Sequence, residues 1–178
     1  MAAYFGLPYN RIDMPILSAH AIELFSNSSD QTRRIGIQLG SLLEKGDVLA
    51  LQGELGAGKT TFTQGLASGW GSAEAVTSPT FVLVNQYERP DGQRMSHLDA
   101  YRLENLSQAE DLDLDLYMQQ GPLIVEWADR LKALLPADHL WIALFHVEEE
   151  RRRLEFHPKG EEFEQRMDRF HKAVAGIL

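Results

Sequence analysis

The sequence has 178 residues, of which 44% are hydrophobic and 24% charged, a composition typical of a globular domain with a hydrophobic core. Its formal net charge of −9 argues against a surface that binds nucleic acid by neutralising phosphates, so any contact with RNA is expected to be indirect, through a partner. The absence of cysteine excludes disulfides, thiolate catalysis and cysteine-ligated metal sites.

The hydropathy of the chain predicts a soluble, cytoplasmic protein without a membrane contact. No stretch approaches the ~18 consecutive apolar residues of a membrane span. The N-terminal sequence MAAYFGLPYNRIDMPIL also lacks the basic and apolar regions of a secretory signal. Because no repeat or long linker divides the chain, residues 1–178 are expected to form one domain, in which residues 1–15 are a loosely patterned extension.

The first half of the chain alternates strand and helix patterns. Residues 16–25 predict a strand, and Ser28 with Gln31 three positions later has the form of a capping box that begins a helix. Helical spacing of apolar residues continues to Leu43, so this helix is expected to end at Gly46. Residues 48–51 then predict a short buried strand.

The segments that follow predict a helix, a hairpin and a further helix. The helix is expected over residues 58–67, ending near glycine 69, and the hairpin over residues 80–87 and 93–98, joined by the turn sequence RPDG. A second capping box, from Ser107 to Glu110, indicates another helix start. The next residues, LDLDLDLY, alternate with period two and leave a strand open as the alternative, although short helices are favoured.

The last third of the chain predicts three strands and a C-terminal helix. Residues 123–126 follow the turn pair Gly-Pro as a buried strand, and residues 140–147 and 153–157 predict later, antiparallel strands. Residues 161–178 predict an amphipathic helix with Phe163, Met167, Phe170, Val174 and Ile177 on one face. This order of elements predicts an α/β fold of three layers, in which helices flank a mixed parallel and antiparallel sheet.

Residues 53–60 carry the most specific motif in the chain. They match G-x-x-x-x-G-K-[ST], the P-loop of nucleotide-binding proteins, with Gly53, Glu54, Leu55, Gly56, Ala57, Gly58, Lys59 and Thr60. Average residue frequencies give such a match by chance roughly once in several hundred sequences. A strand is predicted before the motif and a helix after it, as a P-loop requires. The sequence therefore predicts a site for nucleotide phosphates.

The chemistry of phosphate binding explains the spacing within this motif. Glycines let backbone N–H groups approach phosphate oxygens, and the following helix directs its unpaired N–H groups and positive dipole end toward the same anion. Lys59 is expected to reach the β- and γ-phosphates, and the Thr60 hydroxyl to coordinate Mg²⁺. Thr61, one residue further along the helix, is placed for the α-phosphate.

Glu126 is the second candidate for the metal. It ends an apolar strand, where the Mg²⁺-binding acidic group of a P-loop nucleotidase is expected. A solvated loop carboxylate that caps the next helix is the alternative. Trp127 follows it and is expected to lie beside the nucleotide, flanking the base, with a core tryptophan as the alternative.

Four segments together resemble a specific family, TsaE (also called YjeE), whose members act in bacterial threonylcarbamoyladenosine (t6A) modification of tRNA. They are GDVLALQGELGAGKTTFTQGLA, VTSPTFVLVNQY, HLDAYRL and LIVEWADRL, in this order. The resemblance implies a P-loop NTPase-like fold and a magnesium-dependent ATPase, with ATP and Mg²⁺ as cofactors. It also implies TsaB and TsaD as partner proteins, tRNA only through that complex, and slow hydrolysis that the partners accelerate.

The resemblance also assigns roles to single residues. Thr80, in a switch-like loop, would sense the γ-phosphate or the metal, with a simple turn residue after proline as the alternative. Asp99 matches an acidic position important for hydrolysis, where it would position the attacking water. Arg152 matches an arginine near the nucleotide, with a solvated charge run as the alternative. His97 and Asp99 also have the spacing of a metal pair, although no third ligand is evident.

In this mechanism Lys59, Asp99 and Glu126 are the catalytic residues, and Thr60 and Glu126 hold the metal. Lys59 and Mg²⁺ neutralise charge, while Asp99 or Glu126 orients water. The absence of an N-K-x-D motif argues against a GTPase. A small-molecule kinase remains open, although the only arginine run falls in a predicted strand rather than a lid. A nucleotide-gated binding module remains open as well.

Overall fold

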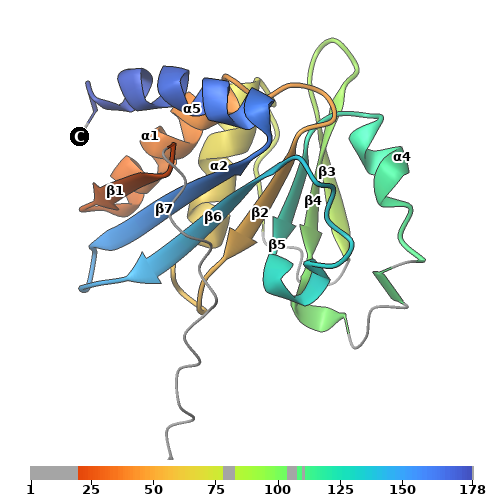
Figure 1. Ribbon diagram of the computed structural model, residues 1–178, viewed down its shortest axis with the longest axis horizontal. Coiled ribbons are helices and arrows are strands. Elements are labelled where there is room, and N and C mark those ends of the chain that lie inside the picture. The colour runs from red at the N-terminus through yellow and green to blue at the C-terminus, as the bar shows by residue number, and fades with distance from the viewer. Residues whose placement is uncertain (1–19, 78–82, 104–107, 110, 178) are drawn as a thin grey trace, which may run out of the picture.

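A mixed seven-stranded sheet forms the centre of the molecule in the computed structural model, which describes residues 20–77, 83–103, 108–109 and 111–177 (Figure 1). The strands are β1 (Ile22–Ser26), β2 (Val48–Gln52), β3 (Val84–Glu88), β4 (Arg94–Asp99), β5 (Leu123–Glu126), β6 (His139–His146) and β7 (Arg152–Lys159). Their order across the sheet is β1-β7-β6-β2-β5-β4-β3. The four central strands, β6, β2, β5 and β4, run parallel. Their carboxyl ends therefore meet at one edge.

Antiparallel strands complete the sheet on both sides. β3 pairs with β4 as the predicted hairpin, and β7 pairs antiparallel with both β6 and β1. The predicted antiparallel arrangement of the two late strands is thus confirmed for β6 with β7, while β6 itself runs parallel to β2. The mixed sheet confirms the predicted fold class.

Helices cover the two faces of the sheet, which gives the three layers. The three longer helices, α1 (Ser29–Gly40), α2 (Lys59–Trp70) and α5 (Glu161–Val174), lie on one face (Figure 1). The short helix α4 (Leu114–Met118) and the 3₁₀ turns η1 (Ala100–Arg102) and η2 (Ala128–Leu131) lie on the other. Within the described ranges no helix is both long and apolar enough to span a membrane.

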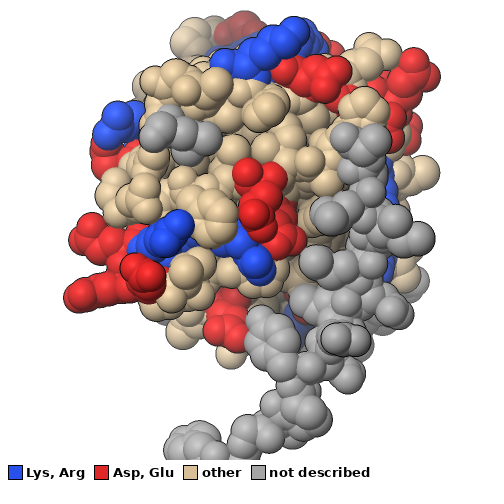
Figure 2. All heavy atoms as spheres, turned by 60° about the vertical axis from the view of Figure 1, so that its left-hand side comes forward, with Lys and Arg blue, Asp and Glu red and all other residues tan. Residues whose placement is uncertain are grey.

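Charged side chains of opposite sign lie beside one another on the surface. On the face shown in Figure 2, acidic side chains lie next to basic ones. Arg34 pairs with Asp30 along α1 at 2.5 Å, and Arg94 with Glu88 across the hairpin at 3.1 Å. Exposed pairs of this kind contribute only about 0–1 kcal/mol each. The fold therefore depends mainly on its buried apolar side chains.

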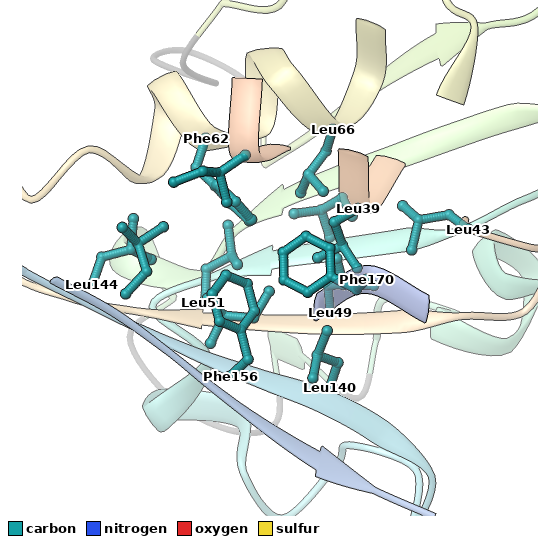
Figure 3. Close-up of a cluster of buried hydrophobic side chains, with 14 of the residues drawn as sticks. Leu39, Leu43, Leu49, Leu51, Phe62, Leu66, Leu140, Leu144, Phe156 and Phe170 are labelled. Carbon is teal, nitrogen blue, oxygen red and sulfur yellow. The ribbon is translucent and has the colours of Figure 1, made fainter. Parts of the chain in front are cut away.

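Two hydrophobic cores lie on opposite faces of the sheet because successive side chains of a strand point to opposite faces. On β2, Leu49 and Leu51 belong to the core beneath the three long helices, while Val48 and Ala50 belong to the core on the other face. Figure 3 shows the first core, in which Phe156 packs against Phe170 of α5 with ring centroids 5.0 Å apart. Both cores hold β2 in the middle of the molecule, and β2 leads into the P-loop.

Glycines let α1 and α2 pack closely against each other. A Cβ atom on Gly36 would lie 2.5 Å from the Phe62 carbonyl oxygen, so a side chain cannot be accommodated there. Gly40 of α1, and Gly65 and Gly69 of α2, are crowded by the partner helix's backbone in the same way. The four glycines are spaced four apart on each helix, which places them on the facing surfaces. This contact fixes the position of α2, whose first residue is Lys59.

One predicted helix end is wrong, and another is confirmed to within one residue. α1 ends at Gly40 rather than at Gly46, because the backbone tightens there into turns such as Leu43 N–H to Gly40 O. Leu43 still reaches the core, from a turn, and this explains why its spacing looked helical. α2 ends at Trp70 with Gly71 as its C-cap, one residue beyond the predicted end near Gly69, and Gly69 itself packs against α1.

Other predicted boundaries agree in part. Ser28 caps α1 by accepting a hydrogen bond from Gln31 N, as predicted. β1 begins at Ile22, later than predicted, and residues 16–19 lie outside the described ranges, as do Ser107 and Glu110 of the second capping box. α4 confirms a short helix in the alternating segment, and α5 ends at Val174, before the predicted end of the C-terminal helix.

Candidate functional site

The loop between β2 and α2 forms an open cradle of backbone. Gly56 and Gly58 have φ angles of 79° and 102°, in the left-handed region that favours glycine. A Cβ atom on Gly53 would lie 2.6 Å from the Leu144 carbonyl oxygen, so this position also requires glycine. Gly58 caps α2 without any side-chain hydrogen bond, which leaves the first N–H groups of the helix available for an anion.

Lys59 lies within this loop with its ammonium directed across it. Its Nζ donates hydrogen bonds to Gly53 O at 2.7 Å and to Glu54 O at 3.0 Å, and it lies 4.1 Å from the centroid of the Trp127 ring. Burial lowers the pKa of Lys59 from its ordinary value, while the nearby carboxylate of Glu126 opposes that shift. The lysine is thus a partly desolvated cation that can exchange carbonyl oxygens for phosphate oxygens.

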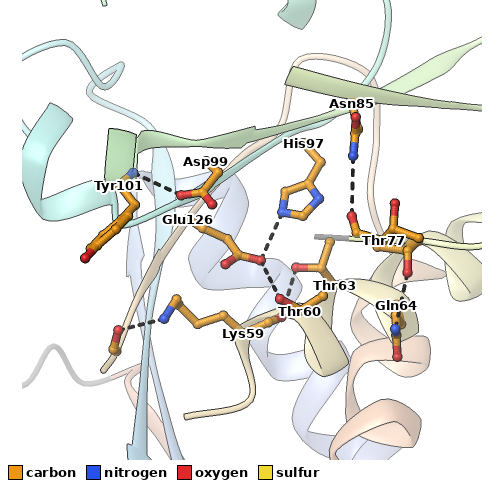
Figure 4. Close-up of polar contacts among 12 residues, drawn as sticks. Lys59, Thr60, Thr63, Gln64, Thr77, Asn85, His97, Asp99, Tyr101 and Glu126 are labelled. Carbon is orange, nitrogen blue, oxygen red and sulfur yellow. Dashed lines mark hydrogen bonds and ion pairs between the residues drawn. The ribbon is translucent and has the colours of Figure 1, made fainter. Parts of the chain in front are cut away.

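Glu126 lies at the carboxyl end of β5, facing the start of α2 (Figure 4). Its Oε1 accepts a hydrogen bond from Thr60 Oγ1 at 3.4 Å and lies 3.0 Å from His97 Nε2. Asp99 is the cross-strand neighbour of Glu126 on β4, and its Oδ1 accepts a hydrogen bond from Tyr101 N at 2.9 Å. Adjacent parallel strands therefore present two carboxylates at the same edge, beside the loop.

A cavity of about 400 Å³, the main cavity, brings most of the predicted site residues together. It is lined by Leu55, Gly56, Gly58, Lys59, Thr60, Thr61, Asp99, Tyr101, Glu126 and Trp127. A second cavity of about 430 Å³ adjoins it and is lined in part by Gly53, Glu54, Leu55 and Trp127. The cradle, its lysine and both carboxylates thus converge on one space, whereas Thr80 lies outside the described residues.

Arg152 lies on another side of the cradle. With Gly56, Gly58 and Thr61 it lines a smaller cavity of about 180 Å³, which places it near the residue predicted for the α-phosphate. Its Nη1 donates to Glu148 O at 2.9 Å and to Glu149 O at 3.2 Å, so the guanidinium also closes the turn between β6 and β7. Contact between Arg152 and a nucleotide stays a prediction.

Trp127 has the only left-handed backbone among the described non-glycine residues, with a φ of 57°. This conformation turns the chain sharply after β5 and carries the indole over Lys59, with its ring centroid 5.0 Å from that of Tyr101. Trp127 also packs partly against the second hydrophobic core. It therefore lies at the phosphate-binding loop, and stacking on a base stays a prediction.

The site fits a divalent cation that takes phosphate oxygens and water among its ligands. No group of three or more histidine or acidic side chains in the described part of the chain could hold a metal alone. Thr60 and Glu126 offer a hydroxyl and a carboxylate next to the phosphate cradle, and Mg²⁺ is commonly bound by one or two protein oxygens together with phosphates. The Nε2 atom of His97 points at Glu126 Oε1. The described structure therefore does not support the alternative in which His97 and Asp99 bind a separate metal ion as a pair.

The structure adds residues whose place at the site the motifs did not indicate. His97 is fully buried against Glu126, and the Tyr87 hydroxyl lies 3.4 Å from its Nδ1. Tyr101 lines the main cavity with more than half of its surface exposed. Both residues belong to the segment HLDAYRL, in which the sequence indicates a role for Asp99 and a candidate metal pair of His97 with Asp99.

The chain is similar in sequence and structure to members of one protein family. A family model described as "Threonylcarbamoyl adenosine biosynthesis protein TsaE" matches residues 26–154. A Bacillus subtilis protein named "tRNA threonylcarbamoyladenosine biosynthesis protein TsaE" is 39% identical over 137 residues, covering 76% of this chain and 84% of that protein. A Streptomyces coelicolor protein of the same name is 46% identical over 110 residues, covering 61% and 74%. A structure titled "Crystal structure of Bacillus subtilus YdiB" superposes with a TM-score of 0.71 at 30% identity, covering 85% of this chain and 95% of that one.

Proposed function

This chain belongs to the TsaE family of tRNA threonylcarbamoyladenosine biosynthesis proteins, and from that premise we propose that it binds and hydrolyses ATP with Mg²⁺, acting with TsaB and TsaD. In this proposal the whole chain, residues 1–178, acts as one ATPase domain. Hydrolysis resets the modification complex between rounds, and tRNA is reached only through the partners. The net charge of −9 supports that indirect contact.

One observation carries the proposal. Lys59, Thr60, Asp99 and Glu126 line a single cavity of about 400 Å³ together with Gly56 and Gly58 of the P-loop. A cation, a hydroxyl and two carboxylates beside unpaired helix N–H groups are the groups that phosphoryl transfer to water requires. The small volume suits the phosphate end of a nucleotide rather than a large second substrate.

Each residue has a role that follows from its position. Lys59 would leave the carbonyl oxygens of the loop for the β- and γ-phosphates, and Thr61 would approach the α-phosphate on the side where Arg152 lies. Thr60 and Glu126 would hold Mg²⁺, which when bound neutralises charge on the phosphates. Asp99 or Glu126 would orient the attacking water. Thr80 is proposed to sense the γ-phosphate or the metal on the ground of the family resemblance alone.

The proposal includes slow hydrolysis by the isolated protein. Among the described residues, no arginine lines the main cavity, and Lys59 is the one cation found there for the transition state. A second cation supplied by a partner commonly accelerates phosphoryl transfer by orders of magnitude. We therefore expect hydrolysis to accelerate when TsaB and TsaD are added.

The test is ATP turnover by the wild type and by Glu126→Gln, each with and without TsaB and TsaD. Glu126→Gln is expected to lower turnover about 100-fold or more, because the amide can neither bind Mg²⁺ strongly nor accept a proton. Glu162→Gln, which changes an exposed carboxylate of α5, is the matched control and should behave as wild type.

Two outcomes would redirect the assignment. Glu126→Gln could abolish hydrolysis yet support repeated rounds of tRNA modification. In that case nucleotide binding rather than hydrolysis controls the modification complex, and the chain is a nucleotide-gated binding module. If ATP is consumed only when a small-molecule acceptor is present, the chain is a kinase. The arginine run argues against the second outcome, because Arg152 and Arg153 lie in β7 rather than in a lid.

A further inference from the structure

His97 of β4 makes a buried contact with Glu126 that the proposed chemistry does not use. We propose that His97 is a positioning residue for the metal site: its Nε2–H holds Glu126 Oε1, so that the carboxylate presents its other oxygen to Mg²⁺ or to a water of its shell. This inference rests on the proposed metal role of Glu126. It assigns the histidine to the support of the carboxylate rather than to the metal itself.

Burial strengthens the hydrogen bond between His97 and Glu126. His97 is 0% exposed and Glu126 is 3% exposed, and Nε2 lies 3.0 Å from Oε1 (Figure 4). A buried carboxylate without hydrogen-bond donors is strongly destabilised, and a donor in a low-dielectric site is correspondingly effective. Both side-chain hydrogen bonds of Glu126 in the described part of the chain, from His97 and from Thr60, involve Oε1. Oε2 is therefore the oxygen available to the cavity.

The carboxylate beside Nε2 fixes which nitrogen of the ring carries the proton. A neutral imidazole has one donor and one acceptor nitrogen, and a carboxylate can only accept, so Nε2 must be the donor. Nδ1 is then an acceptor, and the Tyr87 hydroxyl lies 3.4 Å from it. The Tyr87 hydroxyl donates its own proton to Thr77 O at 3.2 Å, so the tautomer is set by the carboxylate of Glu126 and not by Tyr87.

The sheet register makes this arrangement rigid. Asp99 is paired with Glu126 across β4 and β5, and His97, two residues earlier, is paired with Ile124, so the imidazole approaches the carboxylate diagonally on one face. Tyr87 faces the same side from β3. Three neighbouring strands therefore hold the chain of contacts from Tyr87 through His97 to Glu126. Partners of this kind around a metal ligand commonly change metal affinity or activity about 10- to 100-fold when they are removed.

The experiment compares His97→Leu, which removes the donor, with His97→Gln, which returns an N–H group near the position of Nε2. Nucleotide binding is measured by calorimetry as Mg²⁺ is titrated, and once more in excess chelator. We expect His97→Leu to raise the Mg²⁺ concentration needed for half of the magnesium-dependent effect about 10- to 100-fold. Binding in chelator should stay unchanged, and His97→Gln should recover most of the loss.

A second buried histidine provides the matched control. His157 Nε2 lies 3.3 Å from Glu155 Oε2 on β7, with both residues buried, and neither lines the main cavity. His157→Leu should therefore leave the Mg²⁺ dependence at its wild-type value. If His97→Leu also does, or if His97→Gln is as impaired as His97→Leu, the proposal is wrong.

A measurement on the wild type keeps the inference testable if His97→Leu does not fold. Long-range ¹H–¹⁵N spectra of the imidazole should show the proton on Nε2 of His97. A proton on Nδ1 alone would overturn the proposal. If the wild type hydrolyses no ATP even with TsaB and TsaD, the proposed function fails, but the magnesium titration and the spectra still decide the role of His97.

Discussion

The ammonium of Lys59 lies 4.1 Å from the centroid of the Trp127 indole, at the point where the P-loop helix and the end of β5 meet. A cation over an aromatic face contributes about 0.5–2 kcal/mol, depending on its exposure to water. The indole can take this place because Trp127 adopts a left-handed backbone, which turns the chain back over the loop. A change in the position of Lys59 should therefore be visible at this ring.

Nucleotide binding is expected to change the fluorescence of Trp127 and of no other tryptophan. Neither of the other two tryptophans lines the main cavity. Trp70 packs under the Arg89 guanidinium at 4.6 Å, and Trp141 donates from Nε1 to Gln52 Oε1 at 3.1 Å. Titration with ATP or ADP should give the same signal in Trp70→Phe and Trp141→Phe as in wild type. The signal should be lost in Trp127→Phe. A retained signal in that variant would contradict the placement of the phosphates beside Lys59.

Lys59→Ala is expected to weaken ATP binding roughly 10- to 100-fold, because hydrogen bonds to a charged group contribute about 1.5–3 kcal/mol. Calorimetry in the presence of Mg²⁺ measures the change. Lys45→Ala is the control, since Lys45 is an exposed lysine that lies outside the main cavity. Equal losses in the two variants would mean that the effect is one of overall charge and not of contact with phosphate.

Gly65→Ala is expected to destabilise the protein by about 1–3 kcal/mol in urea unfolding, because the added Cβ meets the α1 backbone. The ideal Cβ would lie 2.9 Å from Gly36 Cα and overlap with Arg33 O. Gly176→Ala is the matched control, as nothing lies within 4 Å of its ideal Cβ. If Gly65→Ala is as stable as Gly176→Ala, the two helices α1 and α2 can move apart with little loss in the free energy of unfolding, and the prediction is wrong.

These glycines illustrate what the sequence could and could not predict. Glycine at a helix terminus and glycine at a helix contact look alike in sequence, so the sequence predicts a helix end near Gly69 and does not show that Gly69 packs against α1. The convergence of Glu126 with the P-loop followed from a general rule, that functional groups gather at the carboxyl ends of parallel strands. The contact of His97 with Glu126 did not follow, because it depends on the register of β4 with β5, which no local pattern specifies.

Arg166 of α5 is a second case in which the partner is distant in sequence. The apolar periodicity of the helix predicted the burial of Phe163, Met167 and Phe170, but not that of Arg166, which is 3% exposed. Its guanidinium forms an ion pair with Asp47, just before β2, and lies 3.6 Å from Glu44. Burial raises the pKa of Asp47 above its ordinary value, and the hydrogen bond from Glu44 N and the charge of Arg166 oppose that shift.

Arg166→Met is expected to destabilise the protein by about 3–5 kcal/mol near neutral pH, because it leaves the Asp47 carboxylate buried without its cation. The loss of Arg166 raises the folded-state pKa of Asp47 further, and a carboxyl whose folded-state pKa is raised is most favourable to folding below its unfolded-state pKa. Stability of the variant should therefore fall, relative to wild type, as pH rises from the folded-state pKa of Asp47 in wild type through its higher folded-state pKa in the variant. Arg169→Met, on the exposed face of the same helix, is the control and should show neither the loss nor the pH dependence. Urea unfolding at a series of pH values measures both variants, and a difference that does not depend on pH would mean that Arg166 stabilises α5 by packing and not by pairing with Asp47.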